Sequence, residues 1–145
     1  HLKNEIVSSL NLSTLSKALV LDGEIVSSNF QELMKQIHRK DSSQNEDASL
    51  FLFDLLPLEN FKLGLYEKTF QERKVSLENI YKKNFSNSEK IKLMNSQLID
   101  LESKIGKEEF NRFNSKSIEN GFEGIMIKDP LSFYECKRST DKTEI

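Results

Sequence analysis

Short apolar segments, separated by longer stretches of helical character, are the feature that most limits how this chain can fold. Residues 18–26, 50–56 and 122–128 carry apolar side chains at most positions. Strands that are covered on both faces have this pattern. Residues 66–84 and 99–120 instead place apolar side chains at roughly helical spacing. The sequence therefore predicts an α+β fold with largely buried strands.

Capping and turn residues predict where further elements begin and end. Asn29 is a suitable N-cap for a helix over residues 30–40. Asn120-Gly121 is a C-cap pattern at the end of the second helical stretch. Residues 90–98 and 133–137 have the weaker pattern of two further short strands. No internal repeat accompanies these elements.

Composition and charge narrow the classes of function. The 145 residues hold 21 lysines and arginines against 23 acidic residues, a net charge of -2. A protein that bound DNA through this chain alone should be more basic, because phosphate contacts dominate such affinity. The single cysteine, Cys136, cannot form an internal disulfide, which fits a reducing compartment. No apolar run approaches the length of about 20 residues that a membrane helix needs.

A carboxylate follows a glycine inside the first apolar segment, at Asp22-Gly23-Glu24. This pattern predicts a strand, a tight turn or bulge, and a second strand. A carboxylate on a rigid strand can meet a metal ion or a ribose hydroxyl at a fixed distance, and Gly23 would let the backbone approach a ligand closely. Taken alone, the segment favours a simpler interpretation, a hairpin turn with an exposed glutamate.

Two aromatic residues alternate in the second apolar segment. Phe51 and Phe53 lie on one face of the predicted strand, where a ring could stack on a purine. Asp54 is an acid in an otherwise apolar run. Taken alone, this segment favours a core strand with one acid whose hydrogen bonds are satisfied.

Charged residues stand at both ends of the third apolar segment. Glu123 and Lys128 are an odd number of steps apart, so a regular strand would send them to opposite faces. A bulge or the twist of the strand would be needed to bring both to one nucleotide. The simpler interpretation is a solvated residue at each end.

In this order the three segments resemble motifs III, IIIa and IV of the covalent nucleotidyltransferases. That superfamily comprises ATP-dependent DNA ligases, RNA ligases and mRNA capping enzymes. Asp22-Gly23-Glu24 resembles motif III, Phe53-Asp54 resembles motif IIIa, and residues 123–128 (Glu-Gly-Ile-Met-Ile-Lys) resemble the DNA-ligase form of motif IV. Lys128-Asp129-Pro130, followed shortly by Tyr134 and Lys137-Arg138, is especially similar to the small DNA ligases of short-tailed bacteriophages. The resemblance spans residues 18–138.

The resemblance implies a fold and a set of residue roles. The fold would be an ATP-grasp-like nucleotidyltransferase (adenylation) domain of antiparallel sheets flanked by helices, incomplete at both ends. Within it, Glu24 would contact the ribose or the metal ion, and Phe53 would stack on adenine. Glu123 would help to hold Mg²⁺ or Mn²⁺, and Lys128 would lie near the ATP phosphates. Lys137-Arg138 is the expected phosphate or DNA contact.

The resemblance also implies a parent enzyme that seals nicks in duplex DNA through enzyme-AMP and DNA-adenylate intermediates. It would act in DNA replication, repair or recombination, as a monomer, in the cytoplasm of a bacterial or phage-infected cell. Motif I (Lys-x-Asp-Gly-x-Arg, with the attacking lysine), motif V and the oligonucleotide-binding (OB-fold) domain are missing, so we expect this chain alone to be inactive. The alternatives are an RNA ligase, a capping enzyme, or a truncated nucleotide-binding module without catalysis.

Overall fold

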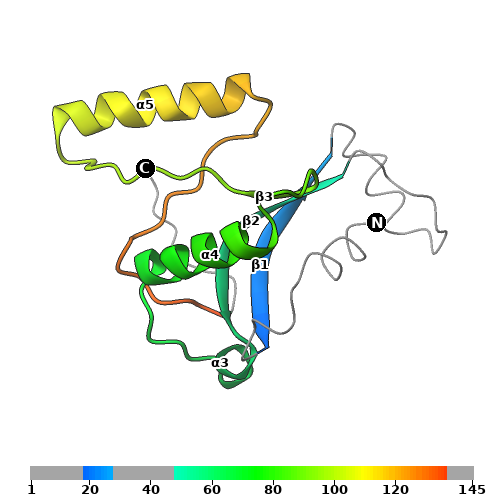
Figure 1. Cartoon of the computed structure of the whole chain (residues 1–145). Helices are drawn as coiled ribbons and strands as arrows, with labels where there is room; N and C mark the ends of the chain where they lie inside the picture. Colours follow the sequence, from blue (N-terminus) through cyan, green and yellow to red (C-terminus); the bar gives the residue numbers. More distant parts are fainter. Residues whose placement is uncertain (1–17, 28–47, 137–145) are drawn as a thin grey trace. The chain divides into compact units, whose positions relative to one another are not determined.

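The computed structural model describes residues 18–27 and 48–136, and the chain divides into two units (Figure 1). The first unit comprises residues 1–94 and 130–145, and the second comprises residues 95–129. In chain order, the described elements of the first unit are β1 (Leu19–Val26), β2 (Ser49–Pro57), α3 (Leu58–Leu63), α4 (Phe70–Asn84) and β3 (Ile91–Leu93). The second unit contains α5 (Lys104–Glu119).

The described strands form one mixed sheet in the order β1-β2-β3. β1 runs antiparallel to β2 along its whole length, from Leu19 opposite Pro57 to Val26 opposite Ser49. β3 is parallel to β2. The expectation of wholly antiparallel sheets is therefore wrong for this sheet. The second pairing is parallel because the chain crosses back through α4 before it adds β3, as parallel neighbours require.

A β-bulge interrupts the pairing of β1 with β2. Asp22 lies opposite Asp54, but Gly23 lies opposite Leu52, so Phe53 is the extra residue on β2. A bulge changes which side chains face the core. Leu52 and Leu55, an odd number of positions apart, consequently reach the same core cluster. Asp22-Gly23-Glu24 lies within one continuous strand, so the tight turn and the hairpin interpretation are wrong. The predicted bulge is present at this segment, with its extra residue on β2.

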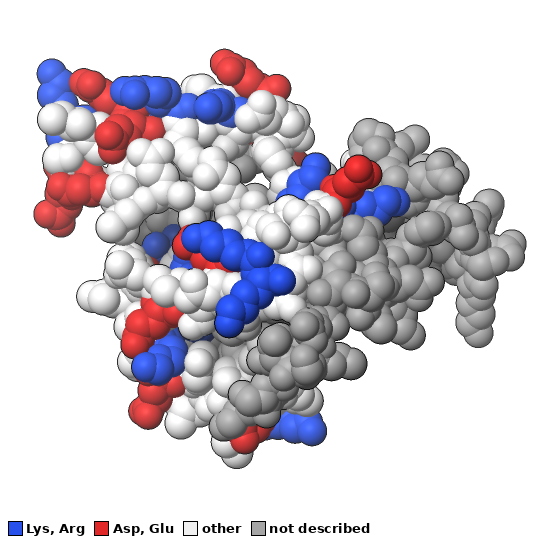
Figure 2. Space-filling view, viewed as in Figure 1, with Lys and Arg blue, Asp and Glu red and all other residues white. Residues whose placement is uncertain are grey.

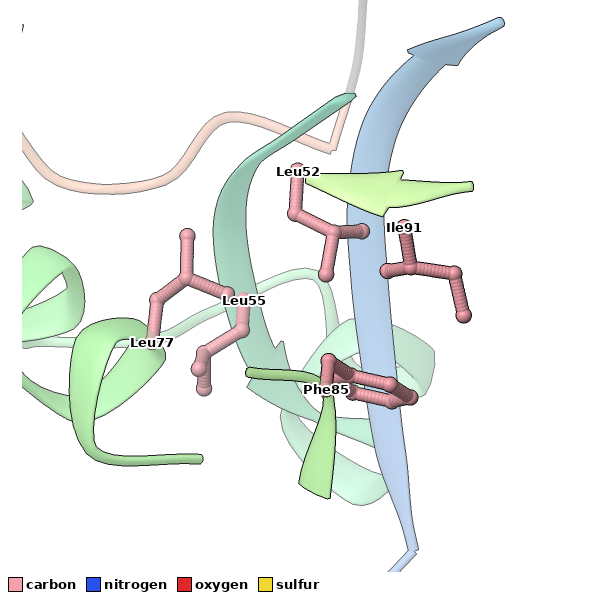
Figure 3. Close-up of a cluster of buried hydrophobic side chains, with 5 residues drawn as sticks. All are labelled: Leu52, Leu55, Leu77, Phe85 and Ile91. Atoms are coloured by element: carbon pink, nitrogen blue, oxygen red, sulfur yellow. The ribbon is translucent and has the colours of Figure 1, made fainter. Parts of the chain in front are cut away.

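The core of the first unit lies between β2, β3 and α4. Its buried members are Leu52, Leu55, Leu77, Phe85 and Ile91. Figure 3 shows Leu77 of α4 next to Leu55 of β2, and Leu52 next to Ile91 of β3. Each fully buried side chain of this size contributes about 1.5–3 kcal/mol. The apolar pattern of the second segment therefore holds the central strand of the sheet in place.

Local sequence explains where α4 begins. Thr69 accepts a hydrogen bond from the Glu72 backbone, and the Glu72 carboxylate accepts one from the Thr69 backbone, which together form a capping box. The helix therefore starts at Phe70, within the stretch predicted from residue 66 onward. It ends at Asn84 as predicted.

In the second unit, the predicted helix is confirmed and the predicted strand is absent. α5 begins after Ser103, whose side chain accepts a hydrogen bond from Gly106 N. Gly121 follows α5 with φ 86°, which confirms the C-cap pattern. Residues 122–128 form no strand, and Met126 is 71% exposed. A strand needs a neighbouring strand for its backbone groups, and the described sheet consists of β1, β2 and β3.

Two further predictions concern segments that lie wholly or partly outside the described residues. The helix predicted over residues 30–40 lies outside them, as do Lys137 and Arg138. Residues 133–136 are described and contain no strand, so the described part of that prediction is wrong. In the parts of the chain that the structure describes, the helices are too short or too polar to cross a membrane.

Candidate functional site

Glu24 projects from β1 just beyond the bulge. Its carboxylate is exposed, and Phe51 is its partner on β2. Gly23 lies in close contact with β2, because a Cβ at this position would come within 2.6 Å of the Phe51 carbonyl oxygen. The close approach that Gly23 permits is therefore to the neighbouring strand.

Phe53 occupies the bulge of β2. Its side chain is half-buried, whereas Leu52 and Asp54 on either side are buried. Bulges often direct a side chain away from the regular alternation of a strand. The structure thus brings Phe53 and Glu24 onto adjacent strands on either side of one irregularity.

Asp54 forms a buried ion pair with Arg73 of α4. Arg73 Nε donates to Asp54 Oδ1 at 2.8 Å, and Nη2 donates to Oδ2 at 3.0 Å. Asp54 is 1% exposed and Arg73 is 3% exposed. The prediction of a core strand with one satisfied acid is confirmed. Arg73 was not predicted as the partner of Asp54, although an acid in so apolar a strand requires a partner somewhere in the fold.

Tyr134 forms a hydrogen bond with Asp22, the acid on the neighbouring strand β1. Its hydroxyl donates to Asp22 Oδ2 at 2.9 Å. Burial, reinforced by this hydrogen bond, raises the pKa of Tyr134 above its usual value. The Arg73 guanidinium carbon lies 5.5 Å from the centroid of the Tyr134 ring. Asp22, Asp54, Arg73 and Tyr134 therefore form one group of contacts, which we call the bulge cluster.

Glu123 and Lys128 belong to the second unit, whereas Glu24 and Phe53 belong to the first. Glu123 is exposed and Lys128 is half-buried. In the described residues, no three histidine, cysteine, aspartate or glutamate side chains gather as a metal site. Each of the two carboxylates, Glu24 and Glu123, is by itself the kind of oxygen ligand that Mg²⁺ prefers.

Charges of both signs are mixed on α5, as Figure 2 shows for the face in view. The helix carries four basic and three acidic residues: Lys104, Lys107, Arg112, Lys116, Glu108, Glu109 and Glu119. A surface of this kind produces no strong field of one sign. The described helix therefore gives no basic surface for DNA, in agreement with the overall net charge of -2.

Comparison with known proteins identifies the family. Residues 2–142 match the family model described as "ATP dependent DNA ligase domain". The chain belongs to this family. The match covers all three motif segments, so the resemblance to DNA ligases is confirmed at the level of the family.

Two curated relatives and two solved structures agree with this assignment. "DNA ligase 2" of Korarchaeum cryptofilum (strain OPF8) is 34% identical over 132 residues, which cover 81% of this chain and 20% of the relative. "DNA ligase" of Thermococcus onnurineus (strain NA1) is 30% identical over 142 residues, 90% of this chain and 23% of the relative. The chain thus spans about a fifth of the length of these curated relatives.

The solved structures are similar in fold as well as in sequence. "Pmar-Lig_PreS3" has a TM-score of 0.85 and 42% identity, and the match covers 94% of this chain and 32% of that one. "Pmar-Lig_Pre." has a TM-score of 0.85 and 40% identity, with 96% and 33% covered. The chain therefore has the α+β fold of a part of these proteins.

Proposed function

We propose that this chain forms part of the adenylation domain of an ATP-dependent DNA ligase that seals nicks in duplex DNA. The enzyme would pass through enzyme-AMP and DNA-adenylate intermediates during replication, repair or recombination. One observation carries the proposal: residues 2–142 match the ligase family and contain the three motif segments in family order. The placement of Glu24 and Phe53 on adjacent strands supports it further.

Each proposed residue has a physical role in phosphoryl transfer. Phe53 stacks on adenine, and Glu24 meets the ribose or the metal ion. Every transfer step places negative charge on phosphate oxygens, which basic groups such as Lys128 stabilise. Bound Mg²⁺ or Mn²⁺ would add positive charge at the same oxygens, held by Glu24 and Glu123. Lys137-Arg138 is the proposed phosphate or DNA contact.

The chain would supply motifs III to IV of a larger domain. The sequence holds no Lys-x-Asp-Gly-x-Arg, so the attacking lysine, motif V and the OB-fold domain would belong to other parts of the enzyme. The whole adenylation domain would be ATP-grasp-like. The span of about a fifth of the curated relatives agrees with this division.

Source and assembly are also part of the proposal. Lys128-Asp129-Pro130 supports a relationship to the ligases of short-tailed bacteriophages, although the two curated relatives described above are archaeal. The complete ligase would work as a monomer in the cytoplasm of a bacterial or phage-infected cell.

Replacement of Phe53 by alanine in the complete ligase tests the proposal. Stacking of a base on an aromatic ring is worth about 1–3 kcal/mol, so we expect the KM for ATP to rise about 5- to 150-fold. Sealing of nicked DNA that is already adenylylated should change much less, because that step needs no free ATP. Steady-state sealing assays on the two substrates measure this difference.

Phe51→Ala is the matched control, since Phe51 lies on the same strand but outside the bulge. It should affect both substrates alike. An equal loss of both activities in Phe53→Ala would contradict the stacking role. Sealing of RNA ends, or capping of diphosphate-ended RNA, in place of sealing nicked duplex DNA would contradict the proposed substrate.

A further inference from the structure

Two carboxylates face each other across the sheet at the bulge. Asp22 of β1 and Asp54 of β2 are direct partners in the register. Like charges directly opposite each other destabilise a sheet. Asp54 is also almost completely buried, which requires a partner for its charge. The pair persists because each acid has its own partner from a distant part of the chain: Arg73 for Asp54, and Tyr134 for Asp22.

Arg73 connects three separate segments of the first unit. Besides its two bonds to Asp54, its Nη1 donates to the carbonyl oxygens of Lys68 at 2.6 Å and Ser132 at 3.2 Å. Its guanidinium carbon lies 5.6 Å from the ring centroid of Phe70. A backbone hydrogen bond from Phe70 N to Ser132 O, 2.8 Å long, also joins the start of α4 to residues 130–134. One side chain therefore fixes β2 against the start of α4 and residues 130–134.

The bulge cluster adjoins both proposed nucleotide contacts. Phe53, the bulged residue, directly precedes Asp54, and Glu24 lies two residues beyond Asp22. We propose that Arg73 is a positioning residue for the nucleotide: through Asp54, with Tyr134 acting through Asp22, it fixes the bulge from which Phe53 and Glu24 project. This inference rests on the proposed ligase function and concerns two residues to which the resemblance assigns no role.

A role in stability alone explains the cluster poorly. Well-packed apolar residues of similar volume stabilise a core as much as a buried ion pair, or more. What a bidentate arginine-carboxylate pair adds is orientation, since two parallel bonds fix both planar groups. Orientation matters most where a bulge directs a side chain toward a ligand.

Conservative variants of the complete ligase test this role. Arg73→Lys keeps the positive charge but loses the planar guanidinium that donates two parallel hydrogen bonds to Asp54. Tyr134→Phe loses only the hydroxyl. We expect the KM for ATP in enzyme-AMP formation to rise about tenfold in Arg73→Lys and about threefold in Tyr134→Phe, in keeping with the loss of one or two hydrogen bonds. Sealing of pre-adenylylated DNA should stay within about twofold of the wild type in both.

Tyr81→Phe is the matched control. Tyr81 also donates a partly buried hydroxyl bond, to the Ile91 carbonyl at 3.3 Å, but it lies outside the bulge cluster. Its loss should leave the KM for ATP unchanged. An equal rise in KM for Tyr81→Phe and Tyr134→Phe would overturn the positioning role, as would an unchanged KM in Arg73→Lys.

The double variant Arg73→Met with Asp54→Leu separates positioning from stability. A positioning role predicts a raised KM for ATP even when the thermal midpoint matches that of the wild type. A double variant with both the thermal midpoint and the KM of the wild type would overturn the inference. If the double variant does not fold, Arg73→Lys and Tyr134→Phe decide the question. A wild-type enzyme without ATP-dependent sealing would refute the proposed function itself, whereas an active wild type with unaffected variants would refute this inference alone.

Discussion

A glycine is required at position 23 for a structural reason, although its motif suggests a functional one. Within Asp22-Gly23-Glu24 the glycine was expected to admit a ligand, but the nearest atoms to its missing Cβ are those of β2. They are the Phe51 carbonyl oxygen at 2.6 Å, the Leu50 Cδ1 at 3.1 Å and the Leu52 Cα at 3.3 Å, and the first and last of these are backbone atoms. Backbone atoms of a paired strand cannot yield as the end of a flexible side chain can.

Gly23→Ala should therefore destabilise the first unit. Forcing an extra methyl into a packed position costs about 1–3 kcal/mol, and the midpoint of urea denaturation should fall accordingly. Gly124→Ala is the control, because a Cβ there meets nothing within 4 Å and should change the midpoint little. Equal shifts in the two variants would contradict the steric account of Gly23.

Tyr134 makes a second prediction at this scale, on alkaline stability. Its pKa is raised in the folded chain by burial and then by Asp22, whereas an unfolded tyrosine titrates at about 10. The unfolded state thus releases its proton first as pH rises. The resulting stabilisation is fully present below about pH 10 and is lost above it, because folding then requires proton uptake.

Denaturation between about pH 8 and pH 11 measures this effect. The wild type should lose stability more steeply than Tyr134→Phe, which has no hydroxyl to titrate. Comparison of the two slopes removes the contribution of the lysines and other tyrosines. Parallel slopes would show that Tyr134 titrates alike in both states.

At the scale of elements, local sequence sets the boundaries of α4. The capping box at Thr69 and Glu72 satisfies backbone groups that would otherwise be left without partners at the N-terminus of the helix. Glu72 also accepts a bond from Lys68 at 3.0 Å, but that pair is exposed and contributes little. The cap therefore accounts for most of the local stabilisation at this end.

Thr69→Ala tests this assignment. Loss of a threonine N-cap costs about 1 kcal/mol, which should lower the thermal midpoint by a few degrees. Ser76→Ala is the matched control within α4: it removes a hydroxyl that bonds only to the Glu72 carbonyl, and alanine favours helix more than serine does. Its midpoint should stay the same or rise. A larger loss in Ser76→Ala would show that the capping box is not what stabilises the start of α4.

Elements with strong local patterns could be predicted from the sequence, and those that depend on a distant neighbour could not. β1, β2, α4 and α5 follow from apolar patterns and caps within each segment. Residues 122–128 also carry apolar side chains at most positions but form no strand in the described structure. Whether such a segment becomes a strand depends on which backbone lies beside it, and periodicity does not contain that information.

The same limit applies to the site. Glu24 and Phe53 could be proposed as site residues because each belongs to a motif whose residues are adjacent in the sequence. Arg73 was missed, as was the contact that Tyr134 makes, because these residues meet Asp54 and Asp22 across 19 and 112 positions. The only local signal was Asp54 itself, a charge in an apolar strand that must find a partner.

At the scale of the whole molecule, the motif residues are divided between the two units. Glu24 and Phe53 belong to the unit of residues 1–94 and 130–145, and Glu123 and Lys128 belong to residues 95–129. Covalent nucleotidyl transfer needs a nucleophile as well as contacts to the nucleotide. The proposed division assigns the contacts to this chain and the attacking lysine to another part of the ligase.

This division predicts that the 145-residue chain alone forms no covalent AMP adduct. A lysine amine attacks the α-phosphate only when it is held in line with the leaving pyrophosphate, and the chain has many lysines but no Lys-x-Asp-Gly-x-Arg to hold one there. Incubation with α-³²P-labelled ATP and Mg²⁺, followed by denaturing electrophoresis, measures the adduct. The complete ligase should become labelled under the same conditions, which shows that the assay works. An acid-labile label on the isolated chain would place the nucleophile among its own lysines and refute the division of labour proposed here.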